Sequence, residues 1–423
     1  MASLHPRVEL HVHLDGSISP STLLRVSQTR NLTLPGIHRV PTSVADIYTA
    51  IYSMGEVWAW FDLVNEIIAG DYATLKSIAE DFVAQQASLN ISYTEVRYDP
   101  VRPSVSHLAN ASISVKEAVL AVQDGLRAGC AKHGVEVHQL LCAMRGKPAS
   151  QCYFVANLAA ELRSGEVGGV VGLDLAGDEG HYNNSFGEVE ACFAHAKTVL
   201  RLNTTVHAGE MADDEYGDVE TAVQVMKADR VGHGYAAVKD WSVLQMLINQ
   251  NVHVEACPAG HHDNLNATGV YHHLGVNFGL STDDPAAYFM NVTLQDVEDL
   301  VTARLGFTPL DISRAYRKAK AAAFAPSAAR IVAEEAAAAK GPTPAILGLA
   351  ALVGFCLLAA IPFVYIYRGG GGSFKARSRG RVGGKRLLAR DRHQRAWKAL
   401  DLPEPSVCTT STSAAGDAGS AKM

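Results

Sequence analysis

Two histidines near the start of the chain have the spacing of a metal-binding pair. His11 and His13 lie two residues apart within a short apolar run. Residues two apart in a β-strand point to the same side, so both imidazoles could bind one metal ion. Two ordinary histidines would give the same pattern, so the assignment depends on which other side chains the fold brings to this place.

Three later apolar runs end in further metal-ligand and proton-transfer groups. These groups are His207 and Glu210, then His233, then Asp283 and Asp284. At the carboxyl ends of parallel strands in one barrel they would all meet at one mouth. Three histidines and one aspartate form a donor set suited to one zinc ion, with a position left for water. Such a zinc ion lowers the pKa of its water to about 7 and so provides a nucleophile at neutral pH.

Eight short runs, rich in apolar and β-branched residues, must position these groups. They span residues 8–14, 94–99, 135–144, 170–176, 204–208, 230–234, 253–257 and 277–282. Most are continuously apolar, as expected for strands covered on both faces, and stretches with helical character separate them. This alternation predicts a (β/α)8 TIM barrel, with a doubly wound open sheet as the alternative. We also expect a closing helix in the Ala-rich residues 321–340.

Taken together, these segments resemble the adenosine deaminase family of metal-dependent amidohydrolases. The matching segments read VELHVHLDGS, TEVRYDP, LDLAGDE, HAGE, RVGHGY and STDDP, and the resemblance covers residues 5 to about 335. It implies hydrolysis of adenosine and 2′-deoxyadenosine to inosine and deoxyinosine with release of ammonia. Family members that act on N6-methylated adenine mononucleotides differ at three of these segments. A related amidohydrolase acting on another 6-aminopurine remains the alternative.

The resemblance also assigns roles to individual residues. It implies four zinc ligands: His11, His13, His207 and Asp283. Glu210 would protonate N1 of the purine, and His233 would orient the attacking water and help to deprotonate it. The residues expected to contact the substrate are His13, Asp15, Gly177 and Asp284. Of these, Asp15 would lie near the ribose 5′-hydroxyl, the backbone of Gly177 near N3, and Asp284 near N7.

An apolar stripe precedes the second predicted strand. Met54, Val57, Trp58 and Phe61 have the spacing of one helix face. Such a stripe belongs either to the core or to a lid. Because the family has an apolar helix that roofs the pocket at this position, we expect a lid that excludes water from the site.

Charge divides the chain into three parts. Residues 1–344 carry 25 basic and 39 acidic side chains, residues 345–367 carry none, and residues 368–423 carry 12 basic and 4 acidic ones. The uncharged run exceeds the roughly 20 residues that cross a bilayer. We therefore predict a catalytic domain (1–340), a linker (341–344), a transmembrane helix (345–367) and a disordered basic tail (368–423). The positive-inside rule places the tail in the cytosol and the domain outside the cell or in a lumen.

Other signals bear on the compartment. Seven Asn-x-Ser/Thr sequons favour exposure to the secretory pathway and predict a glycoprotein, whereas residues 1–7 show no signal peptide. Seven cysteines without CxxC spacing leave disulfides open.

Composition and motifs also exclude several other classes of protein. A composition of 48% hydrophobic and 19% charged residues excludes a mainly disordered or collagen-like chain. The H-x-E…P-C-x-x-C zinc pattern of nucleic-acid and cytidine deaminases is absent, so we expect no nucleic-acid partner. A membrane-anchored adenosine receptor or pseudoenzyme on the same barrel is the alternative from another class.

Overall fold

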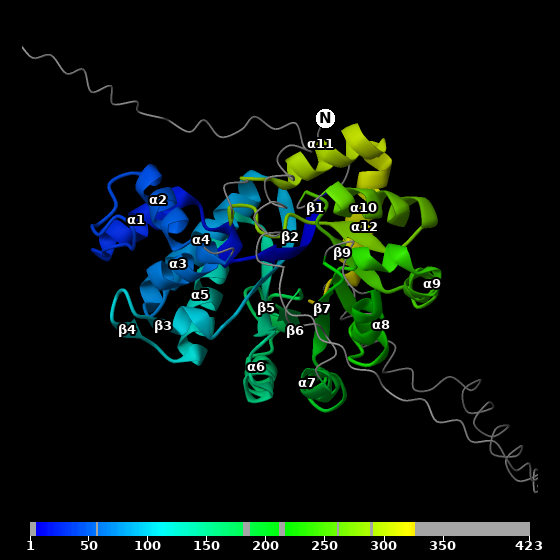
Figure 1. Cartoon of the computed structure of the whole chain (residues 1–423), viewed down its shortest axis with the longest axis horizontal. Coiled ribbons are helices and arrows are strands. Elements are labelled where there is room, and N and C mark those ends of the chain that lie inside the picture. Colours follow the sequence, from blue (N-terminus) through cyan, green and yellow to red (C-terminus); the bar gives the residue numbers. More distant parts are fainter. Residues whose placement is uncertain are drawn as a thin grey trace, which may run out of the picture. The chain divides into compact units, whose positions relative to one another are not determined.

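Eight parallel strands form one sheet that curls into a barrel (Figure 1). The computed structural model describes residues 6–55, 58–180, 187–210, 216–259, 262–287 and 291–325. The strands are β1 (Arg7–His13), β2 (Ile91–Tyr98), β5 (Glu136–Met144), β6 (Val170–Ala176), β7 (Asn203–Ala208), β8 (Arg230–His233), β9 (His253–Ala256) and β10 (Phe278–Leu280). All eight coincide with predicted strands, and each pairs in parallel with the next. The prediction of an α/β barrel is confirmed.

The first and last strands meet where a predicted metal ligand lies. Val12 and Asp283 form a parallel bridge. The His13 N–H donates to the Asp283 carbonyl at 2.9 Å, and the Asp283 N–H donates to the His11 carbonyl at 3.1 Å. The backbone bonds that bring β10 to β1 therefore also place Asp283 beside two histidines.

Helices surround the barrel (Figure 1). The sequence predicts six helices, over residues 72–89, 115–133, 153–164, 187–200, 219–228 and 241–249. They correspond to α4 (Tyr72–Ser88), α5 (Val115–His133), α6 (Ala149–Glu161), α7 (Gly187–Thr198), α8 (Tyr216–Gln224) and α9 (Trp241–Asn249). Three further helices were not predicted: α1 (Pro20–Thr29), α10 (His262–Leu274) and α11 (Leu294–Leu305). Helices α2 (Val44–Met54) and α3 (Ala59–Ile68) lie where the apolar stripe predicted one helix face. The expected closing helix is partly wrong, because α12 (Pro309–Ala322) begins earlier and ends two residues into the predicted range. Residues 326–340 lie outside the described residues.

Local sequence signals set the ends of these helices. Ser114 and Glu117 form a capping box that begins α5, and Gly134, with φ of 71°, ends it. Thr293 and Asp296 begin α11 in the same way. A disulfide between Cys152 and Cys192, which the sequence left open, joins α6 to α7.

The prediction of a single-pass membrane protein is contradicted. Across the parts of the chain that the structure describes, no helix is both long and apolar enough to cross a membrane. The longest of them, α5, has 19 residues and includes charged side chains such as Lys116 and Asp124. The predicted span (345–367), linker (341–344) and tail (368–423) lie outside the described residues. An uncharged run of sufficient length permits a spanning helix but does not by itself form one.

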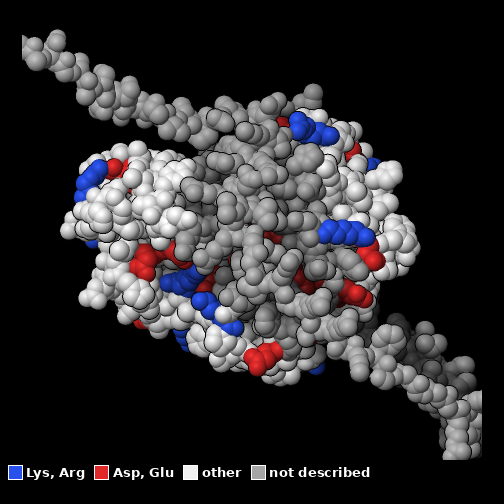
Figure 2. Space-filling view, in the orientation of Figure 1, with Lys and Arg blue, Asp and Glu red and all other residues white. Residues whose placement is uncertain are grey.

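Charges on the pictured face of the molecule are mixed. On the face shown in Figure 2, basic and acidic side chains lie interspersed among uncharged ones. Nucleic-acid-binding proteins usually carry a continuous basic patch or stripe. The expectation of no nucleic-acid partner stays a prediction.

Candidate active site

Four predicted ligands converge at the carboxyl edge of the barrel. The ligand atoms of His11, His13, His207 and Asp283 all lie within 4.8 Å of one another. Asp283 Oδ1 is 3.2 Å from His11 Nε2 and 3.5 Å from His13 Nε2. The Nε2 atoms of His13 and His207 are 3.2 Å apart. Donors placed 2.0–2.1 Å from a tetrahedral zinc ion lie about 3.3 Å from one another, so these spacings fit a metal ion.

Two buried carboxylates orient two of these histidines. His11 Nδ1 is 2.9 Å from Glu255 Oε2, and His207 Nδ1 is 3.1 Å from Asp174 Oδ2. A carboxylate at Nδ1 holds the proton there and turns the Nε2 lone pair toward the metal position. His11 Nε2 is buried and has no hydrogen-bond partner among the described residues, as expected of a nitrogen that serves as a ligand.

Burial keeps His13 and His207 in the neutral form that binds a metal. It lowers the pKa of His207, and it lowers that of His13 well below the usual value. Neutral imidazole is the form that ligates. These donors therefore fit the metal ion that the motifs imply.

Arginines stabilise the supporting carboxylates. Arg97 Nη2 donates to Glu255 at 2.7 Å, and its Nη1 donates to Asp174 at 3.2 Å. Arg230 Nε donates to Glu255 at 2.6 Å. Burial alone would raise the pKa of Glu255, but Arg97 and Arg230 hold it well below the usual range. Burial would also raise the pKa of Asp174, but the charges of His207 and Arg97 outweigh it and lower that pKa.

The backbone adopts unusual conformations at the site. His233 and Asp283 have φ of 64° and 70°, a left-handed region that non-glycine residues rarely adopt. Gly232 makes room for the imidazole of His11, a predicted metal ligand, since a Cβ at residue 232 would lie 2.9 Å from His11 Cε1. Strain of this kind is concentrated at functional sites.

His233 lies in the same cluster. Its Nε2 is 3.9 Å from Asp283 Oδ2, and both ring nitrogens lack hydrogen-bond partners among the described residues. Burial holds its pKa well below the usual value. The Cys257 thiol, which our sequence analysis did not assign, also lies within ligand distance of His11, His233 and Asp283. Burial raises its pKa and so disfavours the thiolate that binds metals.

Asp284 and Asp15 lie beside the cluster. A Cβ at Gly16 would lie 1.8 Å from Asp284 Oδ1, so only glycine leaves room for this carboxyl. Burial, followed by the charges of Asp283 and Asp15, raises the pKa of Asp284 well above its usual value. Burial also raises the pKa of Asp15, whose carboxylate accepts a hydrogen bond from Asn65 Nδ2 at 3.3 Å.

Glu210 and Gly177 follow β7 and β6. Glu210 is partly exposed, and its charge contributes to the raised pKa of Asp284, so the two carboxyls lie near each other. Gly177 has φ of 105°, which glycine alone adopts readily. The structure thus brings the predicted proton donor to the same mouth as the histidines.

The predicted lid stripe is divided between two helices. Helix α2 ends at Met54 because Gly55 adopts φ of 67°, and α3 begins at Ala59. The expectation of one continuous helix face is therefore wrong, and Val57 lies outside the described residues. The Trp58 and Phe61 rings lie 5.8 Å apart.

Helix α3 is nevertheless tied to the site. Trp60 is fully buried, and its indole N–H donates to the Asp15 carbonyl at 3.2 Å. Together with the Asn65 bond, this contact anchors the helix next to the first ligand strand.

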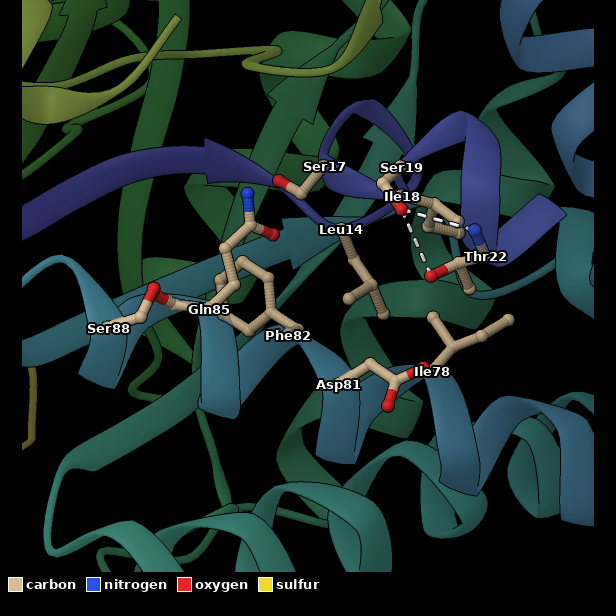
Figure 3. A pocket seen from close by; sticks show the side chains of 10 residues that line it. All are labelled: Leu14, Ser17, Ile18, Ser19, Thr22, Ile78, Asp81, Phe82, Gln85 and Ser88. Atoms are coloured by element: carbon tan, nitrogen blue, oxygen red, sulfur yellow. Dashed lines mark hydrogen bonds between the residues drawn. The ribbon is translucent and has the colours of Figure 1, made fainter. Parts of the chain in front are cut away.

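A separate pocket lies outside this cluster. About 300 Å³ in volume, it is lined by Leu14, Ser17 and Ser19 on one side and by side chains of α4 such as Phe82 on the other (Figure 3). Its lining includes none of the predicted ligand or substrate residues.

Sequence reasoning missed the supporting charges. Arg97, Asp174, Arg230 and Glu255 each lie inside a predicted strand and are at most 1% exposed. A charged residue within a buried apolar strand must find a partner, and this signal could have identified them.

Within parallel β/α barrels, a histidine-rich metal cluster at the carboxyl edge is typical of the amidohydrolases. Comparison with known proteins makes the assignment specific. The family model described as adenosine deaminase matches residues 6–336, and the chain belongs to this family.

A curated relative agrees with that assignment, and solved structures share the fold. Adenosine deaminase from Mus musculus is 32% identical over 342 residues, which cover 76% of this chain and 93% of the mouse protein. A zinc-bound amidohydrolase from Burkholderia ambifaria has a TM-score of 0.64 at 21% identity, covering 79% of this chain and 90% of that one. The N6-methyl-AMP deaminase from Arabidopsis thaliana has a TM-score of 0.63 at 24% identity, covering 80% and 97%. At these identities the two structures establish the fold alone.

Proposed function

We propose that residues 1–340 form a catalytic domain that hydrolyses adenosine and 2′-deoxyadenosine to inosine and deoxyinosine, releasing ammonia. The observation that carries this proposal is the cluster of His11, His13, His207 and Asp283 at the carboxyl edge of a barrel of this family. One zinc ion per chain would be held there and would lower the pKa of a water molecule enough for attack near neutral pH. The zinc-bound relative from Burkholderia ambifaria supports this choice of metal.

His233 and Glu210 would move the protons. Attack at C6 places negative charge on the purine ring, and an acid at N1 relieves it. Glu210 is proposed as that acid. His233 is buried with no competing partner for its ring nitrogens among the described residues, so it can orient the attacking water and accept its proton.

Asp284, Gly177 and Asp15 would hold the substrate, together with His13. N7 of a purine is only an acceptor, so Asp284 must carry a proton to bond with it, and its raised pKa agrees with this role. The backbone of Gly177 would face N3. Asp15 would bind the ribose 5′-hydroxyl and is held in place by Asn65.

The charges near Asp15 favour a nucleoside over a nucleotide. Asp99 lies within electrostatic range of Asp15. A 5′-phosphate at this place would meet like charges, which cost several kcal/mol. Arg102 is also near, but it already pairs with Asp62 at 3.2 Å. The alternative substrate is a mononucleotide or another 6-aminopurine, because a protein of the same fold, from Arabidopsis, is an N6-methyl-AMP deaminase.

The variant Glu210→Gln tests the proposed chemistry. It keeps the shape of the side chain but not its proton, so turnover should fall roughly 10²–10⁴-fold while zinc and nucleoside binding persist. Glu166→Gln, on the exposed surface beside Arg127, serves as the control and should behave like the wild-type chain. Near-normal turnover in Glu210→Gln would remove Glu210 from its role. A chain that binds adenosine and zinc without turnover would favour the receptor or pseudoenzyme.

A further inference from the structure

A buried carboxylate connects two loops at the mouth of the barrel. Glu179 follows β6, and its side chain is only 6% exposed. Its Oε1 accepts the backbone N–H of Gly209 at 2.8 Å, and its Oε2 accepts that of Glu210 at 3.0 Å. Hydrogen bonds to an ionised acceptor are about twice as strong as neutral ones. Both backbone amides of the turn after β7 are thus held by one side chain from another loop.

A second segment of the chain also holds this turn. The Ala236 N–H donates to the Gly209 carbonyl at 3.2 Å. Gly209 has φ of 61°, and a Cβ there would lie 2.8 Å from Ala236 Cβ. Only glycine therefore fits so close to Ala236, and the Glu179 bonds hold the turn to the loop after β6 as well. The backbone from which the Glu210 side chain starts is thus held by two other segments of the chain.

The loop that contributes Glu179 also contributes Gly177. Gly177 lies two residues before Glu179. A Cβ at residue 177 would lie 3.2 Å from the backbone nitrogen of Arg145, so this part of the loop packs tightly as well. Under the proposed function, Gly177 faces N3 and Glu210 faces N1. These two nitrogens belong to one rigid six-membered ring, so the two protein groups must keep a fixed separation.

We propose that Glu179 is a positioning residue, which sets the separation between Gly177 and Glu210 and so aims the proton donor at N1. This inference rests on the proposed function of Glu210. Glu179 acts through the backbone of Glu210 and contacts neither metal nor substrate. A misplacement of about 1 Å at a reacting group can cost 10²-fold in rate.

The test compares Glu179→Gln with a matched carboxylate elsewhere. The glutamine side chain keeps one acceptor oxygen but turns its NH₂ toward a backbone N–H, so one of the two bonds is lost. Glu179→Asp keeps the charge but is one methylene shorter, and it is the second variant should the first fail to fold. The control is Asp240→Asn at the start of α9, where Asp240 accepts the N–H groups of Ser242 and Val243 at 2.8 and 3.2 Å.

Steady-state kinetics with adenosine, zinc content and a double-mutant cycle give the readouts. Glu179→Gln should lower kcat about 10- to 100-fold while zinc stays at one per chain. Asp240→Asn should leave kcat unchanged. In the Glu179→Gln/Glu210→Gln double variant, turnover should be no slower than in Glu210→Gln alone, because Glu179 acts through Glu210.

Two results would overturn the inference while leaving the proposed function intact. One is a kcat in both Glu179 variants that equals that of Asp240→Asn, with Glu210→Gln still impaired. The other is a double variant slowed by the product of the two single effects, which would show that Glu179 acts independently. If Glu210→Gln itself turned over normally, the proposed function would fail first, and the inference would fail with it.

Discussion

Replacing Glu255 by Gln removes the charge that supports one metal ligand and two arginines. The carboxylate lies 2.9 Å from His11 Nδ1 and accepts hydrogen bonds from Arg97 at 2.7 Å and Arg230 at 2.6 Å. It also accepts one from Thr205 at 3.0 Å. Gln is nearly isosteric, but its NH₂ group would face donors on at least one side. The change therefore acts on charge and hydrogen bonding rather than on packing.

Two separate losses follow from this geometry. Breaking a buried ion pair by removing one partner costs about 3–5 kcal/mol of unfolding free energy. Loss of the carboxylate that orients a ligand histidine lowers metal affinity about 10–100-fold. That range corresponds to about 1.4–2.8 kcal/mol of binding free energy.

Glu298→Gln is the matched control. Glu298 is 5% exposed and bonds to Arg7 Nε at 2.7 Å, but it belongs to no metal cluster among the described residues. Both variants should melt at lower temperature than the wild-type chain when zinc is absent. Only Glu255→Gln should bind zinc more weakly in competition with a chelating dye. A Glu255→Gln protein that binds zinc as tightly as Glu298→Gln would refute the idea that the carboxylate prepares His11 for the metal.

Two further predictions concern pH and backbone geometry. Burial lowers the pKa of His253 to about 4. The unfolded chain has a value of about 6.5, so the stability present above that pH is lost as pH falls toward 4, by about 2 kcal/mol at pH 5. His253→Gln should therefore lose less stability than the wild-type chain in thermal unfolding between about pH 7.5 and pH 5, and an equal loss would contradict this account. Gly209→Ala would force φ of 61° on alanine and place its Cβ 2.8 Å from Ala236 Cβ and 2.9 Å from Val219 Cγ2. It should cost roughly 2–5 kcal/mol in urea unfolding and also reduce turnover, since Glu210 follows directly; unchanged stability would show that the turn is not confined.

The barrel was predictable because its strands are short apolar runs separated by stretches with helical character. Strands buried on both faces have little choice of residue type, so the pattern survives in one sequence. Helix α1 was missed, and α2 and α3 were predicted only as one helix face, because this segment interrupts the strand–helix alternation after β1. The break at Gly55 was missed because the prediction rested on the spacing of apolar residues alone. That spacing does not show that a glycine ends the helix.

The metal cluster could be foreseen, but its supporting groups could not. His11 and His13 can be recognised by their spacing, whereas Glu255 meets His11 across 244 residues of sequence. Only the barrel, by placing β1 close to β9, reveals that pair. The hydrogen bonds from the turn after β7 to Glu179 likewise join two loops. Contacts between loops produce no periodic pattern in the sequence.

Side-by-side kinetics with adenosine, AMP and N6-methyl-AMP test the central claim most directly, using the zinc-loaded full chain and following inosine, IMP and the released amine. Because a 5′-phosphate would be placed beside Asp15 and Asp99, kcat/KM for adenosine should exceed that for either nucleotide by about 100-fold or more. Faster turnover of either nucleotide, or no deamination of adenosine at all, would contradict the account.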